Sequence, residues 1–226
     1  MKIENHRFVG DPRVVDLSAK WAPNRKNPIK PNTICIHYDV CETIDGNTAA
    51  QFASGFYYHA AIDGADHDQK LPQVRQYVPF NLQGSHAQGL NATTLGLVIV
   101  NPGPLIRCSD GKLRTTYNEA AFRRGNLKAP TWNEDHAIEA RHPHKNAPKN
   151  WTHWASYSHE ERDTALEICE LWIEEYPSIK QICGHEFLSP GRKFDPGPAA
   201  QDAIMAPLRG AFPWIHVPSY PEQPTP

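Results

Sequence analysis

The sequence predicts an α/β fold in which a mixed central β-sheet is flanked by helices. Three short apolar runs, at residues 33–37, 94–100 and 179–183, have the length and composition of buried strands. One long segment, from Ser158 to Tyr176, carries apolar residues at helical spacing. Because strand-like and helix-like segments alternate along the chain, we expect one sheet covered by helices.

The remaining elements are weaker but follow in order. Residues 45–54 are predicted to form a short helix capped by Asp45 or Asn47. Residues 56–62 are typical of a strand, and residues 74–78 alternate in the way expected of its antiparallel partner.

The clearest helix begins at Ser158. Glu161 follows three residues later, which is the pattern of a capping box. The apolar stripe of this helix predicts packing against the core rather than a cofactor site. Its members are Ala165, Ile168, Cys169, Trp172 and Ile173.

Length and composition fit a single domain. The chain has 226 residues, of which 39% are hydrophobic and 21% charged. We expect an irregular lead-in at residues 1–32, a domain at 33–210 and a proline-rich, frayed tail at 211–226. Residues 104–150 show no hydrophobic period, so we expect a long functional loop with one short helix near 133–140.

Charge and apolar runs argue against several classes of protein. A net charge of −2 disfavours nucleic acid as the main partner. No stretch approaches the roughly 20 apolar residues of a membrane span, and the N-terminus lacks the apolar run of a signal peptide. We therefore expect a protein made in the cytoplasm that needs another route of export. The five cysteines suggest buried free thiols; the oligomeric state is not indicated.

Two histidines and an aspartate supply the residue types of a hydrolytic zinc site. Such a site needs three protein ligands and an open position for water. His37 ends the first predicted strand, His185 follows the last, and Asp195 lies in a loop stiffened by prolines. Lys193 lies two residues before Asp195, where its ammonium is able to face a reacting carbonyl. Each residue also has a purely structural alternative. The histidines could be core residues with hydrogen-bond partners, Asp195 a turn former, and Lys193 part of a solvent-exposed basic surface.

The segment GHEFLSPGRKFDPGPA, residues 184–199, resembles the C-terminal signature of the zinc-dependent N-acetylmuramoyl-L-alanine amidases. That family includes phage lysozyme-amidases, cytoplasmic wall-recycling amidases and animal peptidoglycan recognition proteins. The segment ICIHYDV, residues 34–40, resembles the family's first zinc-ligand strand. The resemblance covers roughly residues 33–103 and 151–205, and it leaves the first 30 residues and 104–150 poorly matched.

The resemblance implies a single domain of the peptidoglycan-recognition/amidase type that holds one Zn²⁺ ion. It implies that His37, His185 and Asp195 are the zinc ligands. By the same resemblance, Lys193 polarises the scissile carbonyl or stabilises its oxyanion.

Two further positions match the family. Tyr58 corresponds to the tyrosine that phage-type members place beside the zinc-bound water, and its alternative role is core packing in a strand. His86 corresponds to a histidine near the substrate cleft, and its alternative role is a hydrogen bond that orders the loop.

One position departs from part of the family. Many wall-recycling members carry a glutamate on the central strand that is able to act as general base, and Val98 stands there in this chain. Phage-type members also lack this acid. The general-base role then falls to Tyr58, to the zinc-bound hydroxide or to a residue of the long loop. Glu139, His142 and His144 are the candidates in that loop, but they are weak ones, and a solvent-exposed loop without a catalytic role is the favoured alternative.

The predicted function is hydrolysis of the amide between N-acetylmuramic acid and L-alanine in peptidoglycan or a muropeptide. Tyr58 and Val98 favour a wall-lytic, phage-lysin-like enzyme that reaches the cell wall through a pore or by injection. The alternatives are a cytoplasmic recycling amidase for anhydro-muropeptides, a non-catalytic peptidoglycan-binding protein, and a zinc hydrolase of another amide or ester. The intact set of three predicted ligands argues against the binding protein.

Overall fold

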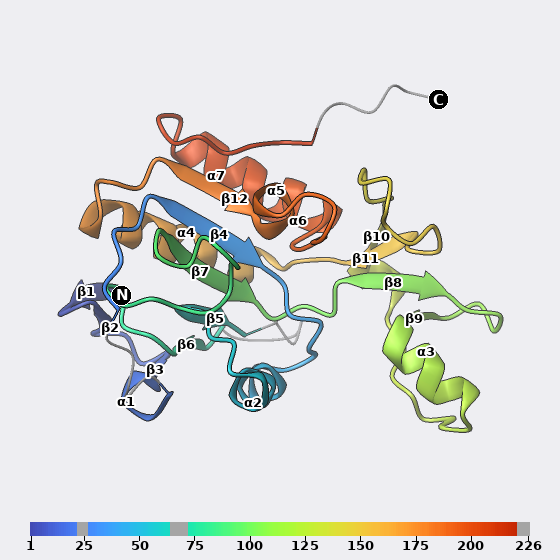
Figure 1. Cartoon of the computed structure of the whole chain (residues 1–226). Helices are drawn as coiled ribbons and strands as arrows, with labels where there is room; N and C mark the ends of the chain where they lie inside the picture. Colours follow the sequence, from blue (N-terminus) through green and yellow to red (C-terminus); the bar gives the residue numbers. More distant parts are fainter. Residues whose placement is uncertain (22–26, 64–71, 221–226) are drawn as a thin grey trace.

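The computed structural model describes residues 1–21, 27–63 and 72–220, and its main feature is a six-stranded mixed sheet (Figure 1). The strand order is β12-β4-β7-β5-β6-β3. All neighbours are parallel except β5 and β6, which are antiparallel as predicted. The strands are β3 (Val14–Asp16), β4 (Thr33–His37), β5 (Ala60–Ile62), β6 (Val74–Gln76), β7 (Thr94–Ile99) and β12 (Gln181–Gly184). The mixed central sheet predicted from the sequence is therefore confirmed.

The two central strands are buried along their whole length. Every residue of β4 and β7 is buried, which explains why both appear in the sequence as apolar runs. Ile36 and Leu97 belong to the larger hydrophobic core, whereas Val98 belongs to a smaller cluster on the other face. His37 is in register with Val98, so its side chain lies on the face of the smaller cluster.

Helix α4 (His159–Glu175) covers the larger core, together with α7 (Ala206–Ala211). Its N-terminus has the predicted capping box, in which Ser158 accepts from the backbone of Glu161 and the Glu161 side chain accepts from that of Ser158. The predicted stripe is buried at four of its positions: Ala165, Ile168, Cys169 and Trp172. Between α4 and α7 in the chain lie η2 (Gln201–Met205), a π-helical turn, and α6 (Pro198–Ala200).

Helix α2 (Ile44–Ser54) lies against the smaller cluster, close to its predicted position. The predicted cap is wrong: Thr43, rather than Asp45 or Asn47, has an extended backbone, and its hydroxyl accepts from Gly46 N–H. The predicted strand at 56–62 is shorter than expected. Its first residues pair with a loop instead, through two backbone hydrogen bonds between Tyr57 and Ser85.

The expectation that residues 1–32 are irregular is wrong for residues 1–21, and residues 22–26 lie outside the described residues. Strands β1 (Lys2–Glu4) and β2 (Arg7–Val9) form a hairpin, β3 joins the central sheet, and α1 (Ser18–Trp21) follows. These strands are three residues long and, apart from Phe8, exposed or half-buried, so they leave no hydrophobic period in the sequence. Tertiary contacts stabilise them, because Phe8 is buried and its N–H donates to the side chain of Gln76.

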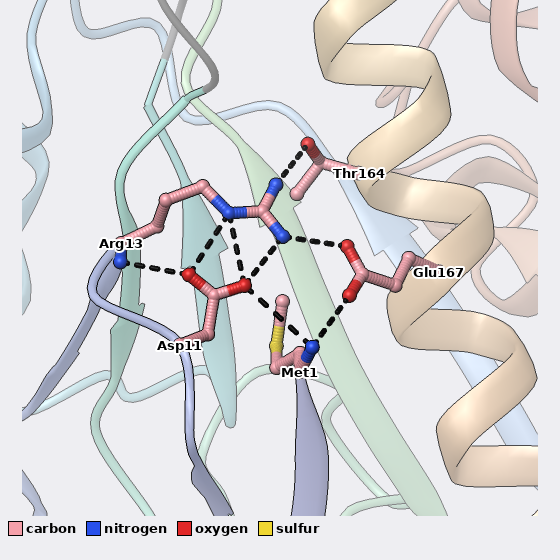
Figure 2. A network of polar contacts seen from close by, with 5 residues as sticks. All are labelled: Met1, Asp11, Arg13, Thr164 and Glu167. Carbon is pink, nitrogen blue, oxygen red and sulfur yellow. Dashed lines mark hydrogen bonds and ion pairs between the residues drawn. The ribbon is translucent and has the colours of Figure 1, made fainter.

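An ionic network fastens this N-terminal segment to α4 (Figure 2). The guanidinium of Arg13 donates to Asp11 at 2.6 Å and to Glu167 at 2.7 Å. The amino group of Met1 lies 3.0 Å from Glu167. Hydrogen bonding to Arg13, opposed by partial burial, lowers the pKa of Asp11 to about 2. The network therefore stabilises the fold while Asp11 is ionised.

The expectation of a long loop at 104–150 is also wrong. Residues 104–155, which we call the insertion, form a second sheet of order β10-β11-β8-β9, which stands beside the central sheet (Figure 1). Its elements are β8 (Pro104–Arg107), β9 (Leu113–Thr115), α3 (Thr116–Arg123), η1 (Glu134–His136), β10 (Ala137–Glu139) and β11 (His153–Ala155). The short helix predicted near 133–140 is the single 3₁₀ turn η1.

The expected frayed tail is ordered up to residue 220. Ile215 and Val217 are buried, and His216 forms a parallel bridge with Gln181. The rest of the predicted tail, 221–226, lies outside the described residues. In the described part of the chain, no helix is both long and apolar enough to cross a membrane. The five cysteines are free, as predicted, and all but Cys41 are buried.

Candidate metal centre

Adjacent strands bring the two predicted histidine ligands together. His37 is the last residue of β4, and His185 follows β12 directly as the first residue of α5 (His185–Leu188). Strands β4 and β12 are parallel neighbours, so their carboxyl ends meet at one edge of the sheet (Figure 1). Asp195 returns to the same edge from the loop after α5, where its backbone carbonyl accepts from Glu186 N–H at 2.9 Å.

The three side chains converge on one buried point. Asp195 Oδ2 lies 2.8 Å from His37 Nδ1 and 3.1 Å from His185 Nδ1. The side chains are 1%, 3% and 11% exposed for His37, His185 and Asp195. Ligands of a tetrahedral zinc ion at its usual bond lengths are about 3.3 Å apart. The spacing and the nitrogen and oxygen donors therefore fit a zinc ion, and the group is able to hold a metal.

The electrostatics of the site favour metal-binding protonation states. Burial lowers the pKa of His37 to about 4, although the hydrogen bond to Asp195 opposes this shift. Burial raises the pKa of Asp195, but hydrogen bonds from His185 and His37 outweigh it and hold the pKa well below its usual range. At neutral pH, His37 is therefore neutral and Asp195 ionised, the forms in which both residues bind metals.

A buried carboxylate shapes the loop that carries Asp195. Glu186 Oε2 lies 3.0 Å from His142 Nε2 and accepts from Gly197 N–H at 3.2 Å. Its other oxygen accepts from Gln201 at 3.3 Å. No pattern in the sequence singles out Glu186, because acidic residues usually lie on a solvated surface.

His86 contacts the ring nitrogen of His37 that faces away from Asp195. Its Nδ1 is 3.1 Å from His37 Nε2, and burial lowers its pKa well below the usual value. A Cβ on Gly96 would lie 2.7 Å from the His86 ring, so this glycine gives the imidazole room to lie on β7. The loop itself is ordered by Asn91, whose side-chain oxygen accepts from the backbone N–H groups of His86 and Ala87.

A cavity of about 590 Å³ opens beside the three converging side chains. Tyr58, His86, His185 and Lys193 contribute to its wall, so the structure brings these predicted residues together. The Tyr58 ring centroid is 4.8 Å from that of His37. Burial raises the pKa of Tyr58 well above its usual value, which keeps the phenol protonated.

The three weaker candidates for a general base do not reach this cavity. Glu139 is exposed on β10, and His142 contacts Glu186 instead. His144 packs against the ring of Phe194. Val98 is buried in the smaller hydrophobic cluster, where its position offers no acid.

A second group of ligand atoms shares His37 and consists of Cys35, His37 and His86. Burial raises the pKa of the Cys35 thiol well above its usual value. A thiol binds metals as the thiolate, so this group is a poorer site than the one with Asp195.

Comparisons with known proteins identify the fold. No protein-family model matches the chain, and no curated protein is significantly similar to it. The N-acetylmuramoyl-L-alanine amidase LysC from Clostridium intestinale URNW has a TM-score of 0.53 at 17% identity, covering 88% of this chain and 99% of that one. AmpDH3 from Pseudomonas aeruginosa has a TM-score of 0.53 at 15% identity, covering 93% and 66%. The chain therefore shares its α/β fold with structures of N-acetylmuramoyl-L-alanine amidases, as the sequence predicts.

Proposed function

We propose that this chain is a zinc-dependent N-acetylmuramoyl-L-alanine amidase that hydrolyses the amide between N-acetylmuramic acid and L-alanine in peptidoglycan or a muropeptide. One observation carries the proposal: His37 Nδ1, His185 Nδ1 and Asp195 Oδ2 converge at a buried point beside an open cavity. The fold shared with LysC supports it. A structure of AmpDH3 in complex with an anhydromuramic pentapeptide is also similar to this chain, with a TM-score of 0.50 and 17% identity.

The three ligands would hold a single Zn²⁺ ion. When bound, zinc supplies a Lewis acid that lowers the pKa of a water ligand to about 7 and polarises a carbonyl. The protein contributes two imidazole nitrogens, an ionised carboxylate and a fixed geometry. Because these groups are buried, little reorganisation is needed as the metal binds.

Lys193 and Tyr58 are proposed to act on the substrate from the cavity wall. The ammonium of Lys193 stabilises negative charge that develops on the scissile carbonyl oxygen. The high pKa of Tyr58 fits a hydrogen-bond donor that orients substrate or water, and it argues against Tyr58 as general base. Both side chains line the cavity that also contains His185.

We further propose a wall-lytic role, in which the enzyme acts on the cell wall. Val98 supports this choice, because it is in register with His37 and places an apolar side chain where a strand glutamate would face the site. Tyr58 beside the zinc site and the absence of a strand glutamate are features of the phage-type N-acetylmuramoyl-L-alanine amidases that this sequence resembles.

The decisive experiment measures hydrolysis of two substrates by the zinc-loaded protein. Intact sacculi and soluble anhydro-muropeptides are incubated with enzyme, and new L-alanine N-termini and free peptides are identified by mass spectrometry. We expect cleavage of sacculi at the muramic acid–alanine bond, its loss with a chelator and its absence in His185→Ala. Preferred cleavage of soluble anhydro-muropeptides would favour the recycling role, and no cleavage of either substrate would overturn the amidase.

A further inference from the structure

A second cavity, of about 560 Å³, lies between the loop after β4 and the insertion. Tyr38, Val40 and Glu42 come from that loop. Tyr117, at the start of α3, and Trp151, just before β11, come from the insertion. The cavity thus depends in part on residues 104–150, which the resemblance leaves poorly matched.

Two contacts place this cavity next to the candidate metal centre. Tyr38 directly follows the proposed ligand His37 in the chain. The ring of Trp151 lies edge-on to Phe194, with 5.6 Å between centroids, and Phe194 directly precedes Asp195. Residues next to two of the proposed ligands therefore connect the metal centre with the second cavity, while His185 itself lines the first.

The second cavity combines aromatic rings with hydrogen-bond acceptors. Tyr117 is 76% exposed, and Trp151 is half-buried and is braced by Trp154, whose ring centroid is 5.9 Å away. Glu42 is exposed, and one of its carboxylate oxygens accepts from the Asn118 amide at 2.7 Å. Rigid aromatic surfaces with a few fixed polar groups are typical of sites for small amphipathic ligands. Sugar rings have this character, with apolar C–H faces and a rim of hydroxyl groups.

The two cavities differ in charge, as do the peptide and sugar parts of the proposed substrate. The cavity beside the metal ligands has two cations, Arg192 and Lys193, and one carboxyl group, that of Asp39, in its wall. The second cavity has the carboxylate of Glu42 and no lysine or arginine among its lining residues. The scissile amide joins a sugar to a peptide that carries carboxylates. An anionic peptide is favoured next to the two cations and disfavoured next to Glu42.

We propose that the second cavity is a glycan subsite, in which N-acetylhexosamine rings stack on Tyr117 and Trp151 while Glu42 accepts hydrogen bonds from their hydroxyl groups. The choice of N-acetylhexosamine as the sugar rests on the proposed function. The aromatic and acidic lining of the cavity is independent of that function. The insertion would thereby select substrates with an extended glycan strand over single-sugar muropeptides. Removing one stacked ring is expected to weaken glycan binding about tenfold.

The test uses the full chain without removal of any bound metal, because the probe contains no bond that the proposed reaction cleaves. The probe is the tetramer of β-1,4-linked N-acetylglucosamine, and its affinity is measured by isothermal titration calorimetry. We expect the parental protein to bind, Tyr117→Ala and Glu42→Gln to bind about tenfold more weakly, and Leu127→Ala to bind like the parent. Leu127 is the matched control, because it is also in the insertion and 79% exposed but does not line the cavity.

A second measurement locates the bound sugar. The indole N–H signal of Trp151 is assigned in a proton–nitrogen NMR spectrum by its loss in Trp151→Phe. We expect the tetramer to shift this signal in the parental protein and to shift it less in Tyr117→Ala.

Three results would overturn the subsite. The first is no binding of the tetramer by the parental protein, and the second is equal binding of the tetramer by the parental protein and Tyr117→Ala. The third is that Tyr117→Ala weakens binding of a free L-Ala-γ-D-Glu-L-Lys-D-Ala peptide but not binding of the tetramer. The probe contains no scissile amide, so these results do not depend on amidase activity. Conversely, sacculi left uncut by a protein that binds the tetramer would overturn the proposed function and leave the subsite standing.

Discussion

The imidazole of His86 is hydrogen bonded to that of His37, with 3.1 Å between His86 Nδ1 and His37 Nε2. The far nitrogen of His86 lies 3.4 Å from both the carbonyl and the hydroxyl oxygen of Thr94. The Thr94 hydroxyl donates its proton to the carbonyl of Leu90 at 2.9 Å, so both Thr94 oxygens are available to accept from His86. When His37 Nδ1 binds a metal, its Nε2–H can therefore donate to His86, whose own N–H then donates to Thr94. Such a partner fixes the orientation of a ligand histidine.

Replacing His86 should weaken zinc binding without removing a ligand. We expect His86→Ala to lower zinc affinity about 10- to 100-fold, measured by competition with a chromophoric chelator. Gly96→Ala should act in the same direction, because its Cβ would lie 2.7 Å from the His86 ring. His159→Ala, an exposed histidine on α4, should bind zinc like the parent. Parental affinity in His86→Ala would show that His86 does not orient His37.

Removing the metal should destabilise the protein. The proposed ligands come from two strand ends and a loop, so an ion bound to all three favours the folded chain. With zinc at about 100 times its Kd, binding contributes about 2.7 kcal/mol, and we expect a chelator to lower Tm by about 5–10 °C. Asp195→Asn serves as the control, and its Tm should not respond to either zinc or chelator. A parental Tm that is unaffected by chelation would contradict the metal centre.

Lys193 should be needed for turnover and not for metal binding. Its side chain contributes to the cavity wall, while the converging ligand atoms belong to other residues. We expect Lys193→Ala to lower kcat about 100- to 1000-fold on a soluble muropeptide and to keep one zinc per chain. Lys180→Ala removes an exposed lysine remote from the cavity and should retain parental kcat. Parental turnover by Lys193→Ala would exclude the proposed role.

Glu186 should matter for stability more than its place beside His185 suggests. Truncation to alanine leaves the Gly197 N–H without its buried acceptor and removes the carboxylate from the His142 imidazole, which keeps its contact with the Tyr220 hydroxyl at 3.1 Å. We expect Glu186→Ala to lower the free energy of unfolding by about 3 kcal/mol in urea. Glu186→Gln, which retains one carbonyl oxygen, should lose less, and Glu174→Ala on the exposed side of α4 should lose little. Equal stability of Glu186→Ala and the parent would contradict this role.

Asp11 should make part of the stability acid-sensitive. Its pKa is about 2 in the folded protein and 3.8 in the reference state, so its ionised form stabilises the fold. This contribution is complete above about pH 4 and is lost as the pH falls through about 2. We expect Asp11→Asn to cost about 1–2 kcal/mol at pH 7. The gap between variant and parent in urea unfolding should narrow from pH 5 to pH 3; a constant gap would contradict the role of the Asp11 charge.

The sequence was sufficient wherever one local signal dominated. The buried runs that became β4 and β7 are largely apolar, and Ser158 with Glu161 forms a capping box that involves neighbouring residues only. The ligand candidates at His37, His185 and Asp195 were also predicted from the sequence, because they lie in two short segments that resemble an amidase signature. Local chemistry of this kind leaves a readable pattern.

The tertiary structure alone decided the insertion, the N-terminal hairpin and the surroundings of the metal site. Strands of three or four residues, such as β8 and β9, are too short to show a period, and their stability comes from partners distant in the chain. The contacts of His86 with His37 and of Trp151 with Phe194 span 49 and 43 residues. No local pattern encodes which distant side chains meet, because that depends on how the sheets and helices pack together.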